Sequence, residues 1–254
     1  MDAKLEALYQ QTLANMETTL HGFCVRVNPP DAVNIRGGDE FVFRYKDQTV
    51  HQALVQKLAR YISGLHAARL LLSKGFMQEQ GAMQRILDEL QEDILFLAYS
   101  VILNKKTDDH VRYLTAFYEE EFDLASGLPT TQRRPMVPRK KIRAYLANVG
   151  GLNDPHGAAN TSRTVSKAYS GYVHAASPHI MDMYGGQPPQ FHVRGVPNAQ
   201  LLEDHAYDLW NYFYRGILAT AICAKAFGLD SAFDDIRGYA SEFARETDSL
   251  DRIR

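Results

Sequence analysis

The feature that most constrains the fold is an apolar stripe of helical period between Gln78 and Leu103. Apolar residues recur there three and four positions apart, so they share one side of a helix. The stripe comprises Met83, Ile86, Leu87, Leu90, Ile94, Leu97, Ala98 and Val101. A helix of this kind must bury its apolar side against other elements. The pattern therefore predicts a long core-facing helix.

Similar spacing covers most of the remaining chain. Thr49 and Gln52 form a possible capping box for a helix that reaches Leu72 and stops at Gly75. Further helices are expected at residues 3–20, at 108–125 after a cap at Asp108 or Asp109, and around 142–149 before Gly150 and Gly151. The last ones are expected from Asn160 or Thr161 to Ala176 (with Asp154 as an alternative start), at Ser177 up to Gly185, at 198–227 and around 233–243. A proline-rich loop is expected from Gly186 to Pro197.

Residues 22–46 depart from this pattern. The stretches "FCVRV" and "EFVFRY" alternate apolar and polar residues around the turn sequences "NPPD" and "RGG". They predict a short β-ribbon of two or three strands.

The fold class that follows is all-α, a helical bundle of about seven or eight helices with one small ribbon near residues 22–46. We expect a single helical domain over residues 1–254. The proline-broken basic stretch "GLPTTQRRPMVPRKK" marks a candidate hinge or boundary at 127–140.

Cysteine usage and the first residues indicate a cellular compartment. The two cysteines, Cys24 and Cys223, are expected to be small buried hydrophobes in a reducing cytosol, although a bridge between them is an alternative. The first twenty residues lack the basic start and apolar run of a signal peptide, and no stretch is apolar enough to span a membrane. We expect a soluble, cytoplasmic protein without a membrane partner.

Charge is distributed unevenly along the chain. Residues 1–123 carry a net charge of -5, residues 124–202 carry +7 and residues 203–254 carry -4. The middle third contains only two acidic residues, Asp154 and Asp182. This basic region predicts an anionic partner.

Named catalytic motifs are absent from the sequence. It contains no phosphate-binding loop, no dinucleotide fingerprint, no hydrolase nucleophile elbow and no common zinc signature. These signals are specific, so their absence removes the corresponding classes.

The strongest candidate site is a polar line on the helix expected from about residue 160. Arg163, Lys167, Ser170 and His174 follow one another at spacings of four, three and four, without a carboxylate among them. Two cations, a hydroxyl and an imidazole can hold a phosphate or carboxylate, and His174 is a candidate proton carrier. The alternative is an ordinary solvated helix face.

Two further groups of residues are candidates. His179 with Asp182 and His205 with Asp208 repeat an H-x-x-D spacing that can hold a divalent metal, or form helix ion pairs. No other cofactor is expected. Arg85 and Glu89 lie four apart on the 78–103 helix, where they form either a surface ion pair or a buried pair that organises a site.

Two segments carry a family resemblance. The stretch "LARYISGLHAARLLLSKGFMQEQGAMQRILDEL", with Arg85, Leu87 and Glu89, and the later "AYSGYVHAASPHI", with Ser170 and His174, resemble an uncharacterised family of bacterial all-helical domains. That family looks similar to the HEPN helical bundles. The resemblance covers about residues 50–180 and implies a dimeric ribonuclease or a nucleotide-binding module.

The HEPN nuclease motif itself, R-x(4–6)-H, is matched only weakly. Arg60 to His66 and Arg44 to His51 fit the string, but about two such matches are expected by chance. Arg60 and His66 lie on different sides of a helix, and the second pair straddles a helix start. This departure weighs against ribonuclease activity.

Three functions therefore remain open. The leading expectation is a HEPN-like protein that binds an anionic ligand, RNA or a nucleotide, through the polar line and nearby basic residues. The alternatives are a metal-independent ribonuclease with His174 as its base, and a non-catalytic interaction scaffold. A homodimer is expected from the resemblance and from the many aromatic residues between 207 and 214, for which burial inside the bundle is the alternative.

Overall fold

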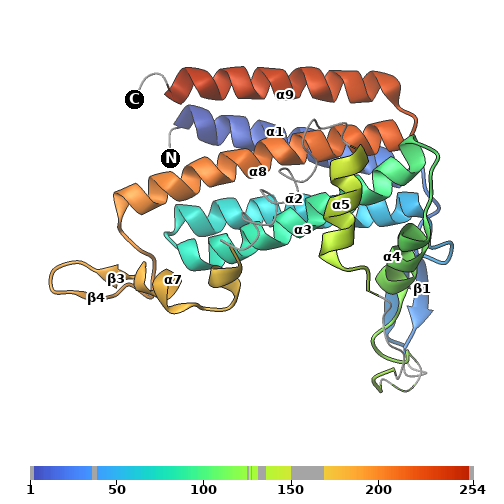
Figure 1. The fold of residues 1–254 in the computed structure, drawn as a ribbon, viewed down its shortest axis with the longest axis horizontal. Helices are drawn as coiled ribbons and strands as arrows, with labels where there is room; N and C mark the ends of the chain where they lie inside the picture. Colours follow the sequence, from blue (N-terminus) through green and yellow to red (C-terminus); the bar gives the residue numbers. More distant parts are fainter. Residues whose placement is uncertain are drawn as a thin grey trace.

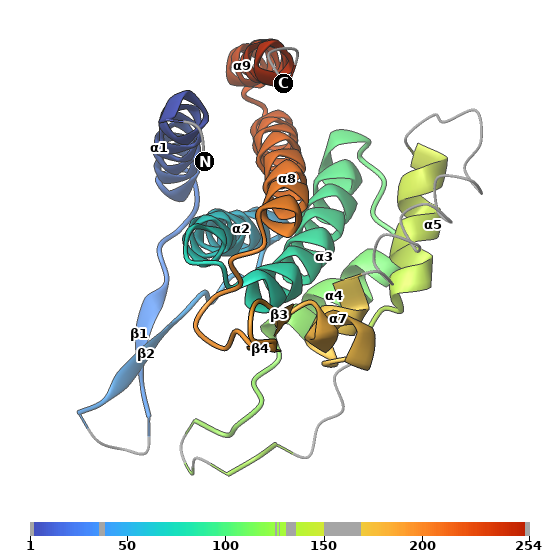
Figure 2. The same cartoon turned by 90° about the vertical axis from the view of Figure 1, so that its left-hand side faces the viewer.

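The computed structural model describes residues 3–35, 39–124, 126, 128–130, 136–149 and 169–251. Three long helices lie side by side at its centre: α2 (Val50–Ser73), α3 (Met77–Ile102) and α8 (Ala199–Ala226). Helices α1 (Ala3–Cys24) and α9 (Asp230–Asp251) cover one side of this layer, and the shorter elements lie on the other side (Figure 1 and Figure 2).

The predicted start and stop of α2 are confirmed. Thr49 and Gln52 form the capping box, in which each side chain bonds to the other residue's backbone N–H. Gly75 ends the helix region with a φ of +74°, and a Cβ at this position would lie 2.9 Å from the carbonyl oxygen of Val196. Only glycine suits this left-handed, crowded position.

Helix α3 carries the predicted stripe into the core. Leu87, Ile94, Leu97 and Ala98 are fully buried in the cluster that also holds the buried side of α2. Ile86 does not follow the prediction, since it is 40% exposed. It lies at the edge of the stripe, where helix curvature and neighbour placement decide burial.

Helices α1, α8 and α9 pack through aromatic rings. Tyr9, Phe213 and Phe243, one from each helix, are fully buried, and the ring of Tyr9 stacks on Phe213 at 4.1 Å between centroids. The Asn198 side chain caps α8 by accepting from Leu201 N–H, as the predicted helix start implied.

The ribbon differs from the prediction in its first strand. Strands β1 (Asp31–Asn34) and β2 (Phe41–Arg44) pair antiparallel, with Ala32 opposite Phe43. The stretch "FCVRV" is not a strand, because Phe23 continues α1 and is buried in the core. Core contact at this position outweighs the local alternation of the sequence.

Helices α4 (Asp108–Tyr118) and α5 (Arg139–Val149) flank α3. The N-cap of α4 is Thr107 instead of the predicted aspartates, and its backbone N–H donates to Nδ1 of His110. The helix also ends at Tyr118, earlier than predicted. The segment 127–140, predicted as a hinge, is described only in part, and both flanking helices contribute to one hydrophobic core.

The predicted helices before α8 are present where the chain is described: residues 169–173 are helical and α7 spans Ser177–Met181. The predicted loop contains strand β4 (Gln190–Phe191), which pairs with β3 (Tyr184–Gly185) in a second small ribbon. Val196 N–H donates to the carbonyl of Gly75, which ties this region to the α2–α3 corner.

The fold class is confirmed: the described chain is an all-α bundle with two small antiparallel ribbons. Within the described ranges, no helix has both the length and the apolar character needed to cross a membrane. Both cysteines are free; Cys223 is buried as expected, and Cys24 is only half-buried.

Candidate functional site

A row of buried polar residues runs along one side of α3. Gln80, Gln84 and Asp88 follow one another at four-residue spacing, which places them on the same face of the helix. Gln80 and Gln84 are fully buried, and Asp88 is nearly so. Polar side chains in the core of a helical bundle are the usual material of its binding sites.

Helix α8 faces this row with polar residues of its own. Arg215 Nη1 donates to Oδ1 of Asp88 at 2.7 Å, and its guanidinium lies 4.9 Å from the ring centre of Tyr212. Arg215 also donates to Gln91 on α3. These contacts hold one oxygen of the Asp88 carboxylate in a fixed position.

His205 lies further along the α3–α8 interface, beside Gln80. Its Nδ1 is 2.5 Å from Oε1 of Gln80, an oxygen that only accepts, so Nδ1 carries the proton. Its Nε2 then accepts from the Tyr172 hydroxyl at 3.3 Å. Gln80, unlike Gln84, is therefore satisfied in the folded chain.

Residues 169–172 run alongside the turn of α3 that carries Gly81. Tyr172 packs on Gly81, where an added Cβ would lie 2.7 Å from its ring. Tyr169 donates to Oδ2 of Asp208 at 2.6 Å and meets the ring of Tyr212 edge-on at 6.1 Å. The tyrosines thus form an aromatic wall between α3 and α8.

Several buried polar atoms in this region have no hydrogen-bond partner among the described residues. They are Nε2 and Oε1 of Gln84 and Nη1 of Arg85, on two consecutive residues of α3. Buried polar groups are almost always paired, because an unmade hydrogen bond costs about 1–3 kcal/mol. These unpaired groups are therefore the strongest sign of a ligand site among the described residues.

The local electrostatics keep the aromatic wall uncharged. Burial, followed by the nearby carboxylates Asp182 and Asp208, raises the pKa of Tyr172 to about 12. Burial is also the largest cause of the raised pKa of Tyr169 and Tyr212. All three phenols therefore stay protonated and act as neutral hydrogen-bonding groups.

We expect the free energy of unfolding to fall as the pH drops below about 6.5, because His205 stays neutral in the folded protein. Burial lowers the pKa of His205 from its ordinary value of 6.5, so the unfolded chain takes up the proton first. Above pH 6.5 the neutral His205 contributes its full share of the free energy of unfolding. Below pH 6.5 this share decreases, by no more than about 1.4 kcal/mol per pH unit, until the pH reaches the folded-state pKa. Urea denaturation across this range measures it. If the unfolding free energy of His205→Gln depended on pH as steeply as that of the parent protein, the expectation would be contradicted.

A second polar cluster lies where α5 meets α3. Arg85 Nη2 pairs with Glu89 Oε1 at 2.6 Å, and Glu89 also lies 3.6 Å from Arg139. Arg139 forms a two-point contact with Asp93, which also accepts from Lys57 at 2.8 Å. The predicted Arg85–Glu89 ion pair is present and belongs to a part-buried network. Its role in organising a site stays a prediction.

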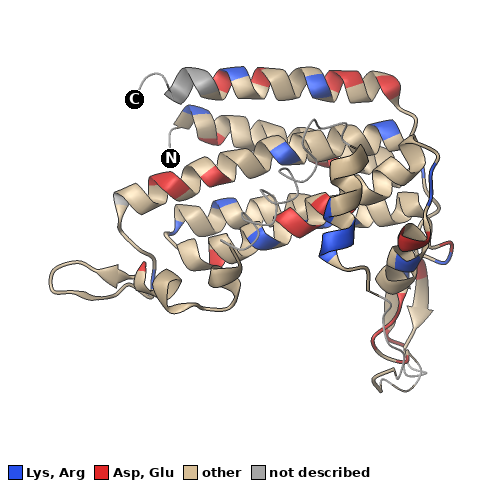
Figure 3. Cartoon of the chain, in the orientation of Figure 1, with Lys and Arg blue, Asp and Glu red and all other residues tan. Residues whose placement is uncertain are grey.

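The basic run of the middle third is partly neutralised by this packing. Figure 3 shows the cations of α5 beside the acids of α3. Arg139, Lys141 and Arg143 all pair with carboxylates of α3 or α4, whereas Lys140 and Arg194 are exposed. At these three residues of α5, the positive charge counted along the sequence is therefore paired and does not form a free basic surface.

The predicted polar line is described only at one end. Arg163 and Lys167 lie outside the described residues. Ser170 is half-buried and His174 is exposed, on the side of the 169–173 helix turn that faces away from Tyr169 and Tyr172. Val173, next to His174, is 48% exposed.

Two of the predicted metal ligands, His179 and His205, lie against Tyr172. The His179 and His205 rings both contact the Tyr172 ring, at 4.4 and 5.6 Å between centroids. Both nitrogens of His205 are engaged, and Asp208 accepts from Tyr169. Over the described ranges no group of three or more His, Cys, Asp and Glu side chains is placed to hold a metal ion. Metal binding by His179, Asp182, His205 and Asp208 stays a prediction.

The two R-x(4–6)-H strings do not bring their members together. Arg60 contacts Met83 while His66 pairs with Glu17. Arg44 pairs with Glu120, and His51 bonds to the carbonyl of Ala226. Each of these residues therefore has a separate structural contact.

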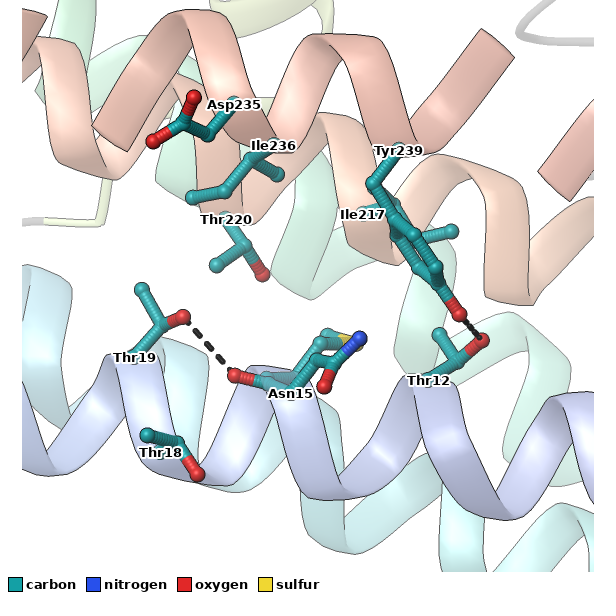
Figure 4. A pocket seen from close by; sticks show the side chains of 10 residues that line it. Thr12, Asn15, Thr18, Thr19, Ile217, Thr220, Asp235, Ile236 and Tyr239 are labelled. Atoms are coloured by element: carbon teal, nitrogen blue, oxygen red, sulfur yellow. Dashed lines mark hydrogen bonds between the residues drawn. The ribbon is translucent and has the colours of Figure 1, made fainter. Parts of the chain in front are cut away.

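Two grooves lie away from the polar cluster. One of about 320 Å³ lies between α1, α8 and α9, and Figure 4 shows the Thr12–Tyr239 hydrogen bond at its edge. Its threonine hydroxyls all donate to carbonyls of their own helices, so the lining presents mainly methyl groups: Thr12, Thr18, Thr19 and Thr220. The other, of about 770 Å³, lies between the Glu6–Arg69 ion pair and Leu202. Neither has the unpaired buried groups of the α3–α8 interface.

Sequence reasoning missed the central residues of this interface. Gln84 and Asp88 were not singled out, although Gln80, Gln84 and Asp88 recur at helical spacing beside the apolar stripe. That spacing was the available signal. It does not distinguish a buried polar row from a solvated one, because burial depends on the position of α8. Tyr212 was noted only among the aromatic residues that suggested a dimer.

Comparisons with protein-family models, with curated proteins and with solved structures give no match to this chain. The functional interpretation therefore rests on the residues themselves.

Proposed function

We propose that this protein binds a nucleotide, with its phosphate at Arg85 and its remaining part against the polar row of α3. The observation that carries the proposal is the Nη1 of Arg85, a buried cationic donor without a partner in the described chain. Leaving such a donor unpaired is costly, and an anionic oxygen is the group that satisfies it best.

The surrounding charges support an anion at this position. Among the described residues, Lys57, Arg85, Arg139 and Arg143 lie in one network with the carboxylates of Glu89, Glu92 and Asp93. A cluster with several cations in one place suits a phosphate. Guanidinium groups suit phosphate oxygens because their donors are planar and fixed.

A nucleotide fits the neighbouring groups better than a simple anion does. Gln84, on the same turn of α3, offers a donor and an acceptor that a bare phosphate cannot use together. Tyr169 and Tyr212 add aromatic surface for a base. The Arg163, Lys167, Ser170 and His174 line is proposed as a contact for further phosphates when the ligand is an RNA strand.

Replacing Arg85 with methionine is expected to weaken nucleotide binding about tenfold to hundredfold, because one charge-assisted hydrogen bond contributes about 1.5–3 kcal/mol. Titration calorimetry with guanosine and adenosine monophosphates measures the effect. Arg194→Met is the matched control, since Arg194 is an exposed cation outside the cluster. Equal affinity of Arg85→Met and the parent protein would contradict the proposal.

The same protein incubated with labelled RNA separates the alternatives. Retention without cleavage extends the proposal to RNA strands. Cleavage that is lost in His174→Ala favours a ribonuclease. If the protein neither binds nucleotides nor binds or cleaves RNA, an interaction scaffold is favoured.

We also propose a homodimer, which light scattering tests directly. Of the aromatic residues that prompted this expectation, Tyr212 and Phe213 are buried in the core, whereas Tyr207 is 63% exposed. Tyr207 stacks on Trp210, which in turn stacks on Tyr214. This partly exposed stack on α8 is the surface we assign to a second copy. A monomer mass at high concentration would exclude it.

A further inference from the structure

The groove between α1, α8 and α9 has an apolar lining on all three helices. Its volume is about 320 Å³, which lies within the range of small-molecule sites. Met16 of α1 and Ile217 of α8 line it and are almost fully buried, and Ile236 of α9 completes the apolar surface. Figure 4 shows α1 on one side of the groove and α9 on the other. The hydrocarbon part of a ligand can therefore leave water here against three helices.

The hydroxyl groups of the groove have their protons engaged within the chain. The Thr12 hydroxyl donates to the carbonyl of Leu8, so the Tyr239 hydroxyl is the donor in the 2.7 Å contact between the two side chains. The other lining threonines also donate to carbonyls of their own helices: Thr18, Thr19 and Thr220. The Asn15 amide is then the one lining side chain that offers a donor to an anion. The groove is therefore poorly suited to phosphate or carboxylate ligands.

Asp235 supplies the only charge among the residues that line this groove. Its side chain is exposed, and it forms no ion pair or hydrogen bond with another residue over the described ranges. Arg237, the cation nearest to it along α9, lies over the ring of Phe233. Figure 4 places Asp235 at the end of the groove farther from the Thr12–Tyr239 hydrogen bond. An unpaired carboxylate at this end attracts a positively charged group.

We propose that the groove binds a small organic ammonium ion, with its hydrocarbon part against Met16 and Ile217 and its charged nitrogen at Asp235. An inorganic cation leaves the apolar lining in water, a neutral hydrocarbon leaves the carboxylate without a counter-charge, and an anion is repelled by it. The groove is formed by α1, α8 and α9, whereas the Arg85 cluster lies where α3 meets α5. The inference therefore does not depend on nucleotide binding.

The first test titrates the isotope-labelled protein with butylamine, hexylamine and octylamine at neutral pH, where all three are protonated. Each added methylene group is expected to raise the affinity about threefold, because it buries further apolar surface. Hexanol and hexanoate are the matched neutral and anionic probes, and hexanoate should bind at least tenfold more weakly than hexylamine. The NMR signals of Ile217 and Ile236 should shift, whereas those of Ile94, in the core on α3, should not.

Two neighbouring aspartates separate a specific contact from general charge attraction. Asp235→Asn is expected to weaken hexylamine binding about threefold to fivefold, the effect of a partly exposed ion pair. Asp234→Asn is the matched control, since Asp234 is equally exposed and removes the same charge but does not line the groove. It should leave the affinity unchanged.

A second pair of variants tests the groove itself. Thr19→Phe places a ring in the groove and should weaken hexylamine binding at least tenfold. Thr115→Phe is its control, because Thr115 of α4 bonds to a carbonyl of its own helix in the same way but lies outside the groove. Thermal denaturation confirms that both variants are folded.

Several results would overturn the proposal. One is the failure of all three amines to bind, and another is binding that shifts neither Ile217 nor Ile236. Equal affinities for hexylamine and hexanol, or equal effects of Asp234→Asn and Asp235→Asn, would show that the carboxylate does not select the ligand. A dimer that dissociates in Thr19→Phe would show that a second copy of the chain covers the groove, and it would also overturn the assignment.

Discussion

Replacing Asp93 with alanine is expected to lower the free energy of unfolding by about 3–5 kcal/mol, because it leaves buried positive charges without their counter-charge. The Asp93 side chain is only 2% exposed and accepts from both Lys57 and Arg139. Lys57 lies over the rings of Tyr113 and Phe117, where water cannot replace the carboxylate fully. Removing Asp93 therefore exposes the full desolvation cost of these cations.

Urea denaturation of the purified variant measures this loss. Asp109→Ala is the matched control, since Asp109 forms an exposed ion pair with Lys141 at 3.0 Å. Such surface pairs contribute about 1 kcal/mol or less. If the two variants lost the same stability, the Asp93 network would be a surface feature and α5 would not depend on it for docking.

Replacing Phe213 with alanine is expected to cost about 3–5 kcal/mol of unfolding free energy, the range observed for deleting a buried aromatic ring. Phe213 is fully buried and stacks on Tyr9 at 4.1 Å. Its removal leaves a cavity where α8 meets α1 and takes away a favourable ring pair. Neighbouring long helices cannot close that space without shifting as a whole.

Thermal and chemical denaturation check this expectation against a second aromatic residue of the same helix. Tyr207→Ala should change the stability by about 0.5 kcal/mol or less, because Tyr207 is 63% exposed. A comparable loss in both variants would show that stacking along α8, instead of core burial, controls the packing of this helix.

Helices and their caps were the most predictable part of the structure. Thr49, Gln52 and Asn198 act locally, since a cap needs only the few residues that follow it. The errors have a different origin. Phe23 continues α1 because a distant core accepts its side chain, and β4 forms inside the stretch predicted as a proline-rich loop.

The candidate site was predictable only in part. Arg85 and Glu89 were predicted to pair because residues four apart on a helix can be recognised from the sequence. His179 and His205 were predicted as metal ligands; their rings both contact Tyr172, and metal binding stays a prediction. Gln84 was missed because its significance lies in the absence of a partner, which no local pattern encodes.

The sequence by itself determined the all-α class, the starts of α2 and α8 and the apolar side of α3, because periodicity and capping depend on residues within a few positions of one another. Only the tertiary structure decided which polar groups are paired. Packing of α5 against α3 pairs Arg139 with Asp93 and so neutralises part of the basic middle third. Packing of α8 against the same helix buries Gln84 and leaves its amide unsatisfied. Charge and hydrogen-bonding capacity are written in the sequence, but their satisfaction depends on contacts between residues far apart along the chain.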